Sequence, residues 1–288
     1  MAILITDYLS LDSLKLKVDG LIINSSLFST FNDKTFSLNQ IKKIALEIKN
    51  NNYLLIINCD RIIPENEIEI FDSFINAIKK LPFDYIIYSD YAILNYFDKS
   101  EYHKLIYDSK TLVCSKEELS VIPTKSFISS EISFEEIKTF DESKGFAIDA
   151  FGYRQMMYSR RPLLSLVLPR NKAKCNTLYD LIEETRNDRY KIYEVKRNKY
   201  NYGTFIYNKG IYLLFNELKE LNNIEMIRLN SMFLGDVIND VAREYYNLLH
   251  LDSYNDLKIK KILSEKLPNI TIDNTFLDRE SVLIKESK

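Results

Sequence analysis

Apolar positions recur along the chain in short runs that alternate with amphipathic stretches. Several runs, such as LLIIN and YIIYS, are continuously apolar, which is typical of parallel strands covered on both faces. Runs of this kind predict eight strands: Ile3–Thr6, Gly20–Asn24, Tyr53–Asn58, Tyr85–Ser89, Lys104–Tyr107, Ser126–Ser129, Phe146–Phe151 and Met226–Asn230. Strands that alternate with helices indicate the α/β class.

Helical periodicity is clear between several of these strands. Apolar side chains repeat at helical spacing within residues 41–48, 68–78 and 237–248. Ser133 followed by Glu136 is a capping-box pattern that predicts a helix over Phe134–Thr139. Eight strands with intervening helices predict a (β/α)8 TIM-like barrel, with a doubly wound open sheet as the alternative.

The segment 166–210 breaks the alternation. It predicts a charged helix over Tyr179–Arg186 and then an antiparallel hairpin that pairs Tyr190–Val195 with Gly203–Tyr207. We interpret this helix-hairpin segment as an insertion between the last two barrel strands. The barrel should therefore span residues 1–250 with this insertion included.

Length and composition fit one large core followed by a peripheral segment. The chain has 288 residues, of which 46% are hydrophobic, and residues 251–288 predict a helical C-terminal tail. The formal net charge of -2 excludes a strongly basic nucleic-acid binder, so any RNA contact needs a local patch. No apolar run reaches the ~20 residues of a membrane span, and the start MAILITDYLS lacks a signal-peptide pattern. We expect a cytoplasmic protein that binds neither membrane nor DNA.

Cysteine and histidine spacing gives no motif for a metal site. The three cysteines, Cys59, Cys114 and Cys175, are scattered singly, and His103 and His250 lie far apart. There is also no phosphate-binding glycine loop and no dinucleotide fingerprint. The sequence therefore predicts no metal site and no evident cofactor.

In a β/α barrel, functional side chains collect at the carboxyl ends of the strands. Asp90 and Glu131 follow predicted strands and are the candidate catalytic carboxylates, and Arg61 is a candidate for substrate binding. Capping and turn formation are the alternative roles for polar residues at such positions.

The most distinctive stretch is GYRQMMYSRRPLLS, residues 152–165. Gly152 follows a predicted strand in a chain with only six glycines, which indicates a sharp turn. We expect substrate contacts from this loop, with Arg160 and Arg161 pointing into the barrel mouth, because guanidinium groups suit carboxylates and phosphates. A solvated basic loop is the alternative. The candidate binding residues are Gly152, Arg154, Tyr158, Arg160 and Arg161, and Ser159 is a candidate nucleophile.

Several motifs resemble, in order, those of peptidase family U-32, the collagenase-like group. They are SDYAIL at residues 89–94, TLVCS at 111–115, SSEIS at 129–133 and the loop at 152–165. The resemblance covers roughly residues 1–250 and implies a barrel-like fold. It also implies a link to prephenate-dependent hydroxylation of the tRNA wobble uridine or to ubiquinone-ring hydroxylation. Short members in low-GC bacteria commonly accompany a longer paralogue, and several members hold a four-iron–four-sulfur cluster with four cysteines.

The chain departs from the family pattern at informative positions. Phe151 stands where the family usually has His, Ser130 stands where Arg is expected, and the cluster cysteines have no counterpart. The resemblance therefore implies a short subunit that contributes to wobble-uridine hydroxylation, with tRNA and a longer U-32 paralogue as partners. A collagenase-like peptidase and a non-catalytic scaffold subunit are the alternatives.

Overall fold

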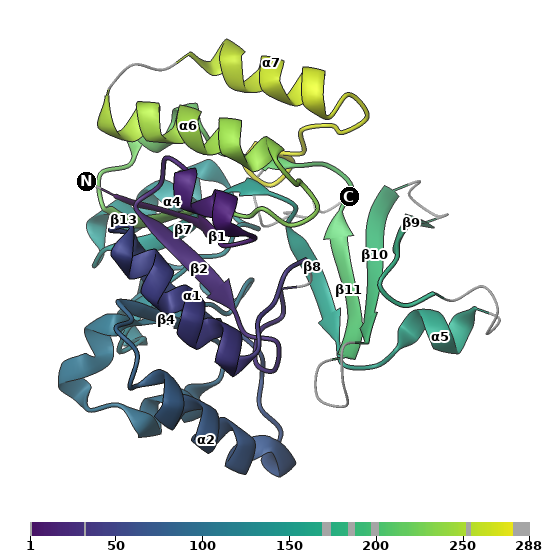
Figure 1. Ribbon diagram of the computed structural model, residues 1–288. Coiled ribbons are helices and arrows are strands. Elements are labelled where there is room, and N and C mark those ends of the chain that lie inside the picture. Colours follow the sequence, from purple (N-terminus) through teal and green to yellow (C-terminus); the bar gives the residue numbers. More distant parts are fainter. Residues whose placement is uncertain are drawn as a thin grey trace, which may run out of the picture.

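The computed structural model describes residues 2–31, 33–168, 174–183, 188–196, 202–251 and 255–278. Nine strands within these residues form one sheet in the order β12-β7-β13-β1-β2-β3-β4-β5-β6, and all neighbours are parallel except β12 and β7 (Figure 1). The bounds are β1 Ile3–Asp7, β2 Gly20–Asn24, β3 Leu54–Cys59, β4 Tyr85–Tyr88, β5 Leu105–Tyr107, β6 Lys125–Ser126, β7 Phe146–Gly152, β12 Tyr212–Leu213 and β13 Ile224–Leu229. Each of the eight predicted strands is confirmed at its place, although β6 is shorter than expected.

The parallel sheet is curled, and its two ends approach each other. Phe127, which follows β6, forms a parallel bridge with Ala147 of β7, and the Ile128 amide donates to the Ala147 carbonyl over 2.9 Å. The concave side is filled by one buried apolar side chain from each of the eight parallel strands or its end: Ile5, Ile22, Ile56, Ile87, Ile106, Phe127, Ala147 and Met226. This apolar layer closes the interior below the carboxyl ends of the strands.

The mixed α/β class is confirmed, but the complete eightfold (β/α)8 repeat is not. The connection from β1 to β2 carries only a 3-10 helix, Leu11–Lys15, and two more 3-10 helices, Tyr91–Tyr96 and Lys99–Lys104, join β4 to β5. Short connections of this kind replace the full helices that a regular TIM barrel places after each strand.

The α-helices pack outside the curled sheet. The helices around this sheet are α1 Leu38–Asn50, α2 Ile68–Ile78, α3 Lys116–Val121, α4 Phe134–Thr139 and α6 Val237–His250, and α7 Asp256–Lys266 packs against α6 (Figure 1). The predicted apolar stripe of α1 is buried, and the Ser133–Glu136 capping box opens α4 as expected. None of the helices in the described ranges has the length and apolar character needed to cross a bilayer.

A second, antiparallel sheet lies between β7 and β12 in the sequence and beside the curled sheet in Figure 1. Its order is β8-β11-β10-β9, with β8 Gln155–Ser159, β9 Leu178–Glu183, β10 Asp188–Lys196 and β11 Tyr202–Asn208, and α5 Leu163–Val167 follows β8. The predicted hairpin is confirmed, because Val195 pairs with Gly203 and Lys191 with Tyr207.

The helix predicted over Tyr179–Arg186 is wrong for its described part. Residues Leu178–Glu183 form β9, in which Tyr179 pairs with Ile192 and Leu181 with Tyr190, and residues 184–187 lie outside the described residues. Pairing with the edge of β10 outweighs the helical propensity of the charged side chains, because strand formation depends on packing against a neighbour.

The C-terminal segment returns to the curled sheet after α7. Ile272 forms a bridge with Ile211, and the Asn274 side chain binds the Leu213 backbone through both its oxygen (2.9 Å) and its nitrogen (2.7 Å). These contacts hold residues 272–276 beside β12, near the carboxyl end of β7.

Candidate functional site

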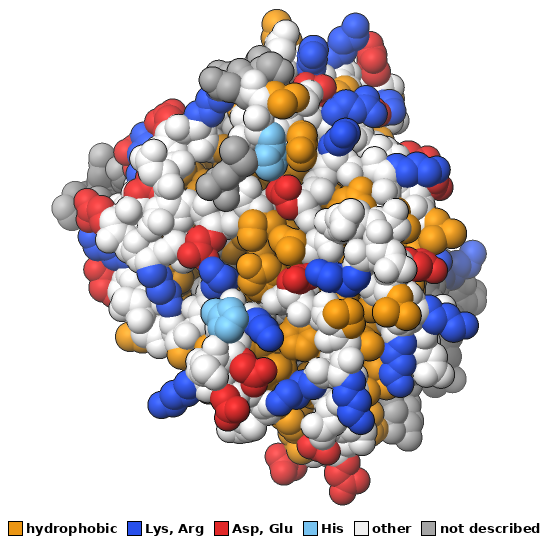
Figure 2. All heavy atoms as spheres, turned by 60° about the vertical axis from the view of Figure 1, so that its left-hand side comes forward, with side chains coloured by type: hydrophobic (Ala, Val, Ile, Leu, Met, Phe, Trp, Pro, Cys, Tyr) orange, Lys and Arg blue, Asp and Glu red, His pale blue; other side chains and the backbone are white. Residues whose placement is uncertain are grey.

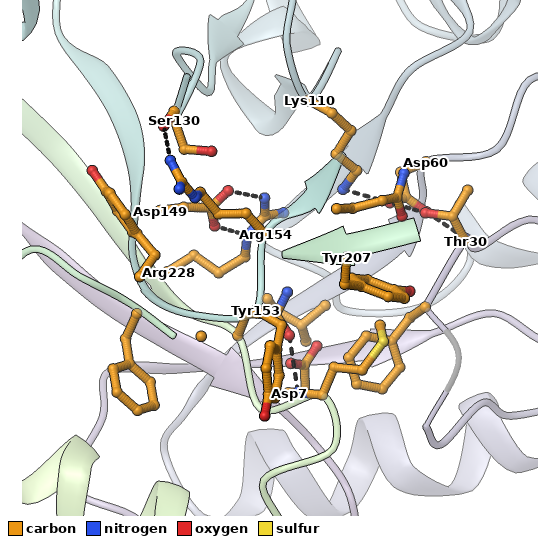
Figure 3. Close-up of a pocket in the computed structure, with 18 of the residues that line it drawn as sticks. Asp7, Thr30, Asp60, Lys110, Ser130, Asp149, Tyr153, Arg154, Tyr207 and Arg228 are labelled. Atoms are coloured by element: carbon orange, nitrogen blue, oxygen red, sulfur yellow. Dashed lines mark hydrogen bonds and ion pairs between the residues drawn. The ribbon is translucent and has the colours of Figure 1, made fainter. Parts of the chain in front are cut away.

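A polar cavity of about 60 Å³ lies at the carboxyl ends of the strands, above the apolar layer (Figure 3). Charged side chains from several parallel strands and the loops that follow them converge on it: Asp7, Asp60, Lys110, Asp149, Arg154 and Arg228. Carboxyl ends of parallel strands are the usual place for functional residues in such sheets. This cavity is therefore the candidate functional site.

Arg228 of β13 is the central cation of the site. Its Nε and Nη2 donate to the two carboxylate oxygens of Asp149 on β7 over 2.5 and 2.7 Å, and its Nη1 donates to Asp108 over 2.7 Å. The guanidinium also lies 4.0 Å from the ring centre of Phe127. Burial alone would raise the pKa of Asp108, but the charges of Arg228 and Lys110 hold it well below its usual range. The Asp108 carboxyl and the Arg228 guanidinium are therefore both ionised at neutral pH.

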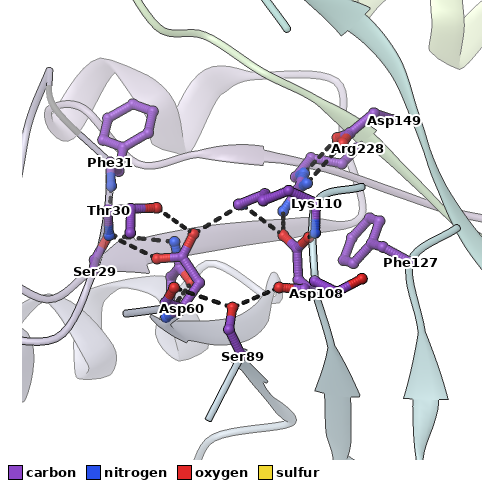
Figure 4. A network of polar contacts seen from close by, with 12 residues as sticks. Ser29, Thr30, Phe31, Asp60, Ser89, Asp108, Lys110, Phe127, Asp149 and Arg228 are labelled. Carbon is purple, nitrogen blue, oxygen red and sulfur yellow. Dashed lines mark hydrogen bonds and ion pairs between the residues drawn. The ribbon is translucent and has the colours of Figure 1, made fainter. Parts of the chain in front are cut away.

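Lys110 continues this chain of charges on the other side of Asp108. Its Nζ lies 2.7 Å from Asp108 Oδ2 and 2.8 Å from Asp60 Oδ2. Burial works against the charge of Lys110, but the two carboxylates raise its pKa. Asp60 also accepts from the amide and the hydroxyl of Thr30, each over 2.7 Å. The result is an alternating row, Asp149–Arg228–Asp108–Lys110–Asp60, across the cavity (Figure 4).

Asp7, at the end of β1, differs from the other carboxylates of the cavity. It accepts from Asn24 Nδ2 over 2.9 Å and from the Ser231 hydroxyl over 2.9 Å, and no ion pair joins it to a cation within the described residues. Burial raises the pKa of Asp7, and the hydrogen bonds of Asn24 and Ser231 and the charge of Arg228 oppose this rise only in part. Asp7 therefore retains a proton to higher pH than an ordinary aspartate does.

Gly152 and Arg154, both predicted from the sequence, line the cavity. Gly152 has a φ of +114°, and a Cβ there would lie 2.4 Å from the carbonyl oxygen of Asn230. Only glycine therefore allows the end of β7 to approach Asn230 so closely. Arg154 follows this turn and donates to the Ser130 carbonyl over 2.9 Å.

The other predicted arginines do not line the cavity. Arg61 is buried, binds the Glu67 carboxylate and donates from Nε to the Leu27 carbonyl over 2.8 Å. Arg160 binds the same carboxylate, with 2.8 Å between Nη2 and Glu67 Oε1, and Arg161 is exposed. The expectation that Arg160 and Arg161 point together into the mouth is therefore wrong, because Glu67 draws Arg160 aside and Arg161 faces solvent.

The predicted carboxylates, Asp90 and Glu131, do not line the cavity. Asp90 accepts from the amides of Ile63 and Ala92 over 2.8 and 2.9 Å, as a capping residue does. Glu131 is half-buried, and burial raises its pKa against the charge of Arg154.

Two further candidates, Tyr158 and Ser159, belong to β8. Tyr158 stacks on Phe205 with 4.6 Å between ring centres and lines a more apolar groove beside the cavity. The Ser159 hydroxyl accepts from the Arg161 amide over 3.1 Å. Neither residue lines the charged cavity itself.

Sequence reasoning missed five charged residues of the site: Asp7, Asp60, Lys110, Asp149 and Arg228. A signal for two of them was present, because Asp149 and Arg228 interrupt the apolar runs FAIDAFG and IEMIRL. A charge inside a buried strand is costly unless a partner neutralises it, so two such charges in different strands indicate a pair.

The cysteines of this chain do not fit an iron–sulfur cluster. Cys59 is buried in β3, whereas Cys114 and Cys175 are exposed in separate segments. Across the described ranges, no three His, Cys, Asp or Glu side chains gather as a possible metal site. Such a cluster would need thiolate ligands from a partner.

Comparison with known proteins identifies relatives at the level of the family. The family model described as Peptidase family U32 matches residues 17–267. The solved structure of the U32 peptidase Mk0906 is similar with a TM-score of 0.48 and 11% sequence identity, covering 79% of this chain and 92% of that chain. No curated protein matches the sequence significantly.

Proposed function

The chain belongs to peptidase family U32, and from that premise we propose that it binds a small charged metabolite in the cavity. We further propose that it contributes in this way to prephenate-dependent hydroxylation of the tRNA wobble uridine. The observation that carries the proposal is the row of alternating charges, Asp149–Arg228–Asp108–Lys110–Asp60, in and directly beneath the cavity wall. Charges fixed by one another present a rigid, preorganised surface to a charged ligand.

The size of the cavity favours a small molecule. A space of about 60 Å³ holds several waters or part of a metabolite, whereas an extended polypeptide needs a continuous groove. Aromatic side chains, including Phe31, Tyr153 and Tyr207, stand beside the charged groups in its wall. A polar group held next to aromatic rings is typical of metabolite sites.

A peptidase is the second candidate, and the geometry of Ser159 does not favour it. A serine nucleophile needs a base within hydrogen-bond reach. The Ser159 hydroxyl is bound to the Arg161 amide, while His103 Nδ1 lies 2.7 Å from the Ser100 carbonyl and His250 Nε2 lies 3.5 Å from Asp19. Within the described part of the chain, no histidine is hydrogen-bonded to Ser159.

In this proposal the chain works beside a longer U32 paralogue, with tRNA as the shared substrate. The paralogue holds any redox cluster, because the three cysteines here do not fit one. The face shown in Figure 2 intersperses acidic and basic side chains rather than gathering the basic ones, so we assign the main RNA contact to the partner or to another face. In the alternative of a non-catalytic scaffold, the chain also binds the longer paralogue, but its cavity needs no ligand.

A deletion strain tests the proposal. Nucleosides from its tRNA are analysed by mass spectrometry, and we expect hydroxylated wobble uridine to disappear and to return with the wild-type gene. Complementation with Arg228→Met separates metabolite binding from scaffolding, because this change removes the central cation of the cavity. Full hydroxylation in the deletion strain contradicts the proposed function, and full rescue by a folded Arg228→Met protein favours the scaffold.

A further inference from the structure

Two buried polar atoms in the wall of the cavity, Arg154 Nε and the Tyr212 hydroxyl, have no hydrogen-bond partner among the residues that the structure describes. Both residues line the cavity, with exposed fractions of 5% and 1%. Buried polar groups are nearly always hydrogen-bonded in folded proteins, and an exception calls for a specific explanation. Two such atoms in one cavity wall indicate a ligand group that binds both.

Arg154 also differs from the other cations of the cavity in its charge balance. Arg228 and Lys110 each have two carboxylates within 2.8 Å. Arg154 instead donates to two carbonyl oxygens, those of Ser130 at 2.9 Å and Asp273 at 3.4 Å. The carboxylate oxygen Asp273 Oδ1 lies 3.9 Å from Nη2, beyond hydrogen-bond distance. Asp273 and Glu131 therefore act on the Arg154 charge only from a longer range, and within the described residues no carboxylate is hydrogen-bonded to its guanidinium.

Aromatic rings hold the Arg154 guanidinium in place. The ring centre of Tyr212 lies 5.0 Å from its central carbon, and that of Phe276 lies 4.7 Å away. Stacking against these rings fixes the planar guanidinium. The Arg154 side chain therefore loses little conformational entropy when an anion binds. Phe276 and Asp273 belong to the C-terminal segment, which therefore forms part of this site.

Tyr212 is suited to donate a hydrogen bond to the same anion. Burial raises its pKa, against the opposing charge of Arg154, so the phenol keeps its proton throughout the physiological pH range. Tyr212 pairs with Gly152 across the junction of β12 and β7, and this pairing brings it close to Arg154. A protonated phenol and a guanidinium are both donors, which is the chemistry that an oxyanion requires.

We propose that Arg154 and Tyr212 form an oxyanion subsite that binds the carboxylate or phosphate group of a small organic ligand. Phe31, Tyr153 and Tyr207 contact its hydrocarbon part in the same cavity. This inference rests on the proposed metabolite-binding role of the cavity and names the chemical class of its ligand.

Calorimetric titration of the purified full-length chain tests the subsite with four probes. Phenylacetate and phenyl phosphate distinguish a carboxylate from a phosphate ester, inorganic phosphate tests the oxyanion alone, and benzyl alcohol is the uncharged control. We expect at least one of the two aromatic anions to bind and benzyl alcohol not to bind. Equal binding of benzyl alcohol, or no binding of any anion, overturns the proposal.

Three variants locate the binding. We expect Arg154→Gln to raise the Kd of the bound anion about tenfold or more, and Tyr212→Phe to raise it severalfold, because charged hydrogen bonds contribute most. Arg161→Gln is the matched control, since Arg161 is exposed outside the cavity, and its Kd should equal that of the wild type. Tyr212→Phe keeps the ring that packs on Arg154, so it remains decisive if Arg154→Gln does not fold. An unchanged Kd in folded Tyr212→Phe and Arg154→Gln overturns the subsite.

Failure of the subsite and failure of the proposed function give different results. Anion binding that depends on Arg154 and Tyr212, in a protein whose deletion leaves wobble uridine hydroxylated, supports the subsite and contradicts the tRNA role. Loss of hydroxylation in the deletion strain, with no anion bound by the purified chain, supports the tRNA role and overturns the subsite.

Discussion

Arg228 on β13 and Asp149 on β7 form a two-pronged ion pair between neighbouring parallel strands, with N–O distances of 2.5 and 2.7 Å. The third nitrogen of the guanidinium binds Asp108, which is 1% exposed. One cation thus bridges two carboxylates, and Lys110 supplies a second positive charge to Asp108. The arrangement is rigid because the guanidinium fork matches the carboxylate geometry.

Removing this cation should destabilise the fold. In Arg228→Met, Asp149 loses its cation and Asp108 keeps only Lys110, so a buried charge is left partly uncompensated. Breaking a buried ion pair costs about 3–5 kcal/mol, and we expect about 3 kcal/mol here, measured as the free energy of unfolding in urea. Arg243→Met is the matched control, because Arg243 is 61% exposed in its pair with Asp240 and should change stability by less than about 1 kcal/mol. Equal losses in both variants would contradict this account of the ion pair.

The buried carboxyl of Asp7 should make stability depend on pH. Its folded-state pKa is raised, chiefly by burial, above the unfolded value. Its contribution is therefore fully present below the unfolded pKa and is lost as the pH rises through the folded pKa. Relative to Asp7→Asn, the wild type should lose about 1.4 kcal/mol for each pH unit between these two pKa values and no more above them.

Urea unfolding of both proteins at several pH values between 4 and 8 measures this difference. Asp72→Asn, on the exposed side of α2, is the control and should give a curve parallel to that of the wild type. A constant difference between wild type and Asp7→Asn across the range would show that Asp7 does not titrate as its burial predicts.

The sequence pattern predicted the strands well, because a buried strand shows itself as a run of consecutive apolar residues. The site was only partly predictable, for a topological reason. Gly152 and Arg154 were recognisable as a rare glycine followed by a cation after a strand. Asp149 and Arg228 lie 79 residues apart and meet only because β13 inserts beside β7 after the second sheet. Local sequence patterns do not predict which strands become neighbours in a sheet.

The helix predicted at Tyr179–Arg186 failed for a related reason. Its charged residues favour a helix locally, but its described part extends the sheet edge that β10 offers. Similarly, the guanidinium of Arg160 in the loop 152–165 was expected to point into the barrel mouth, whereas Glu67 binds it outside the cavity. In both cases a contact that the local sequence does not show determined the structure: pairing with β10 for β9, and Glu67 for Arg160.

The three thiols should react at very different rates. Burial in β3 raises the pKa of Cys59, and the neighbouring charge of Asp60 raises it further, so little thiolate forms at pH 8. Cys175 and Cys114 are exposed, although partial burial raises the pKa of Cys114. With iodoacetamide and mass spectrometry we expect alkylation of Cys175 first and Cys114 next, with Cys59 modified only after unfolding in urea. Rapid labelling of Cys59 in the native protein would show that β3 opens locally.

Gly152 should be the glycine least tolerant of substitution near the site. Gly152→Ala places a side chain at a φ of +114° and a Cβ 2.4 Å from the Asn230 carbonyl oxygen, a backbone atom that cannot rotate away. We expect a loss of about 3 kcal/mol in the free energy of unfolding, since backbone strain and steric overlap add. The shift of the turn should also weaken anion binding at Arg154, measured by the same titration.

Gly235→Ala is the control that separates the steric overlap of a new Cβ from the cost of a positive φ. Gly235 also has a positive φ, +54°, but a Cβ there meets nothing within 4 Å, so only the cost of the left-handed conformation applies. That cost is about 1 kcal/mol, and anion binding should stay unchanged because Gly235 does not line the cavity. Equal destabilisation by the two substitutions would mean that β7 can move away from Asn230. The close contact would then have no part in positioning Arg154.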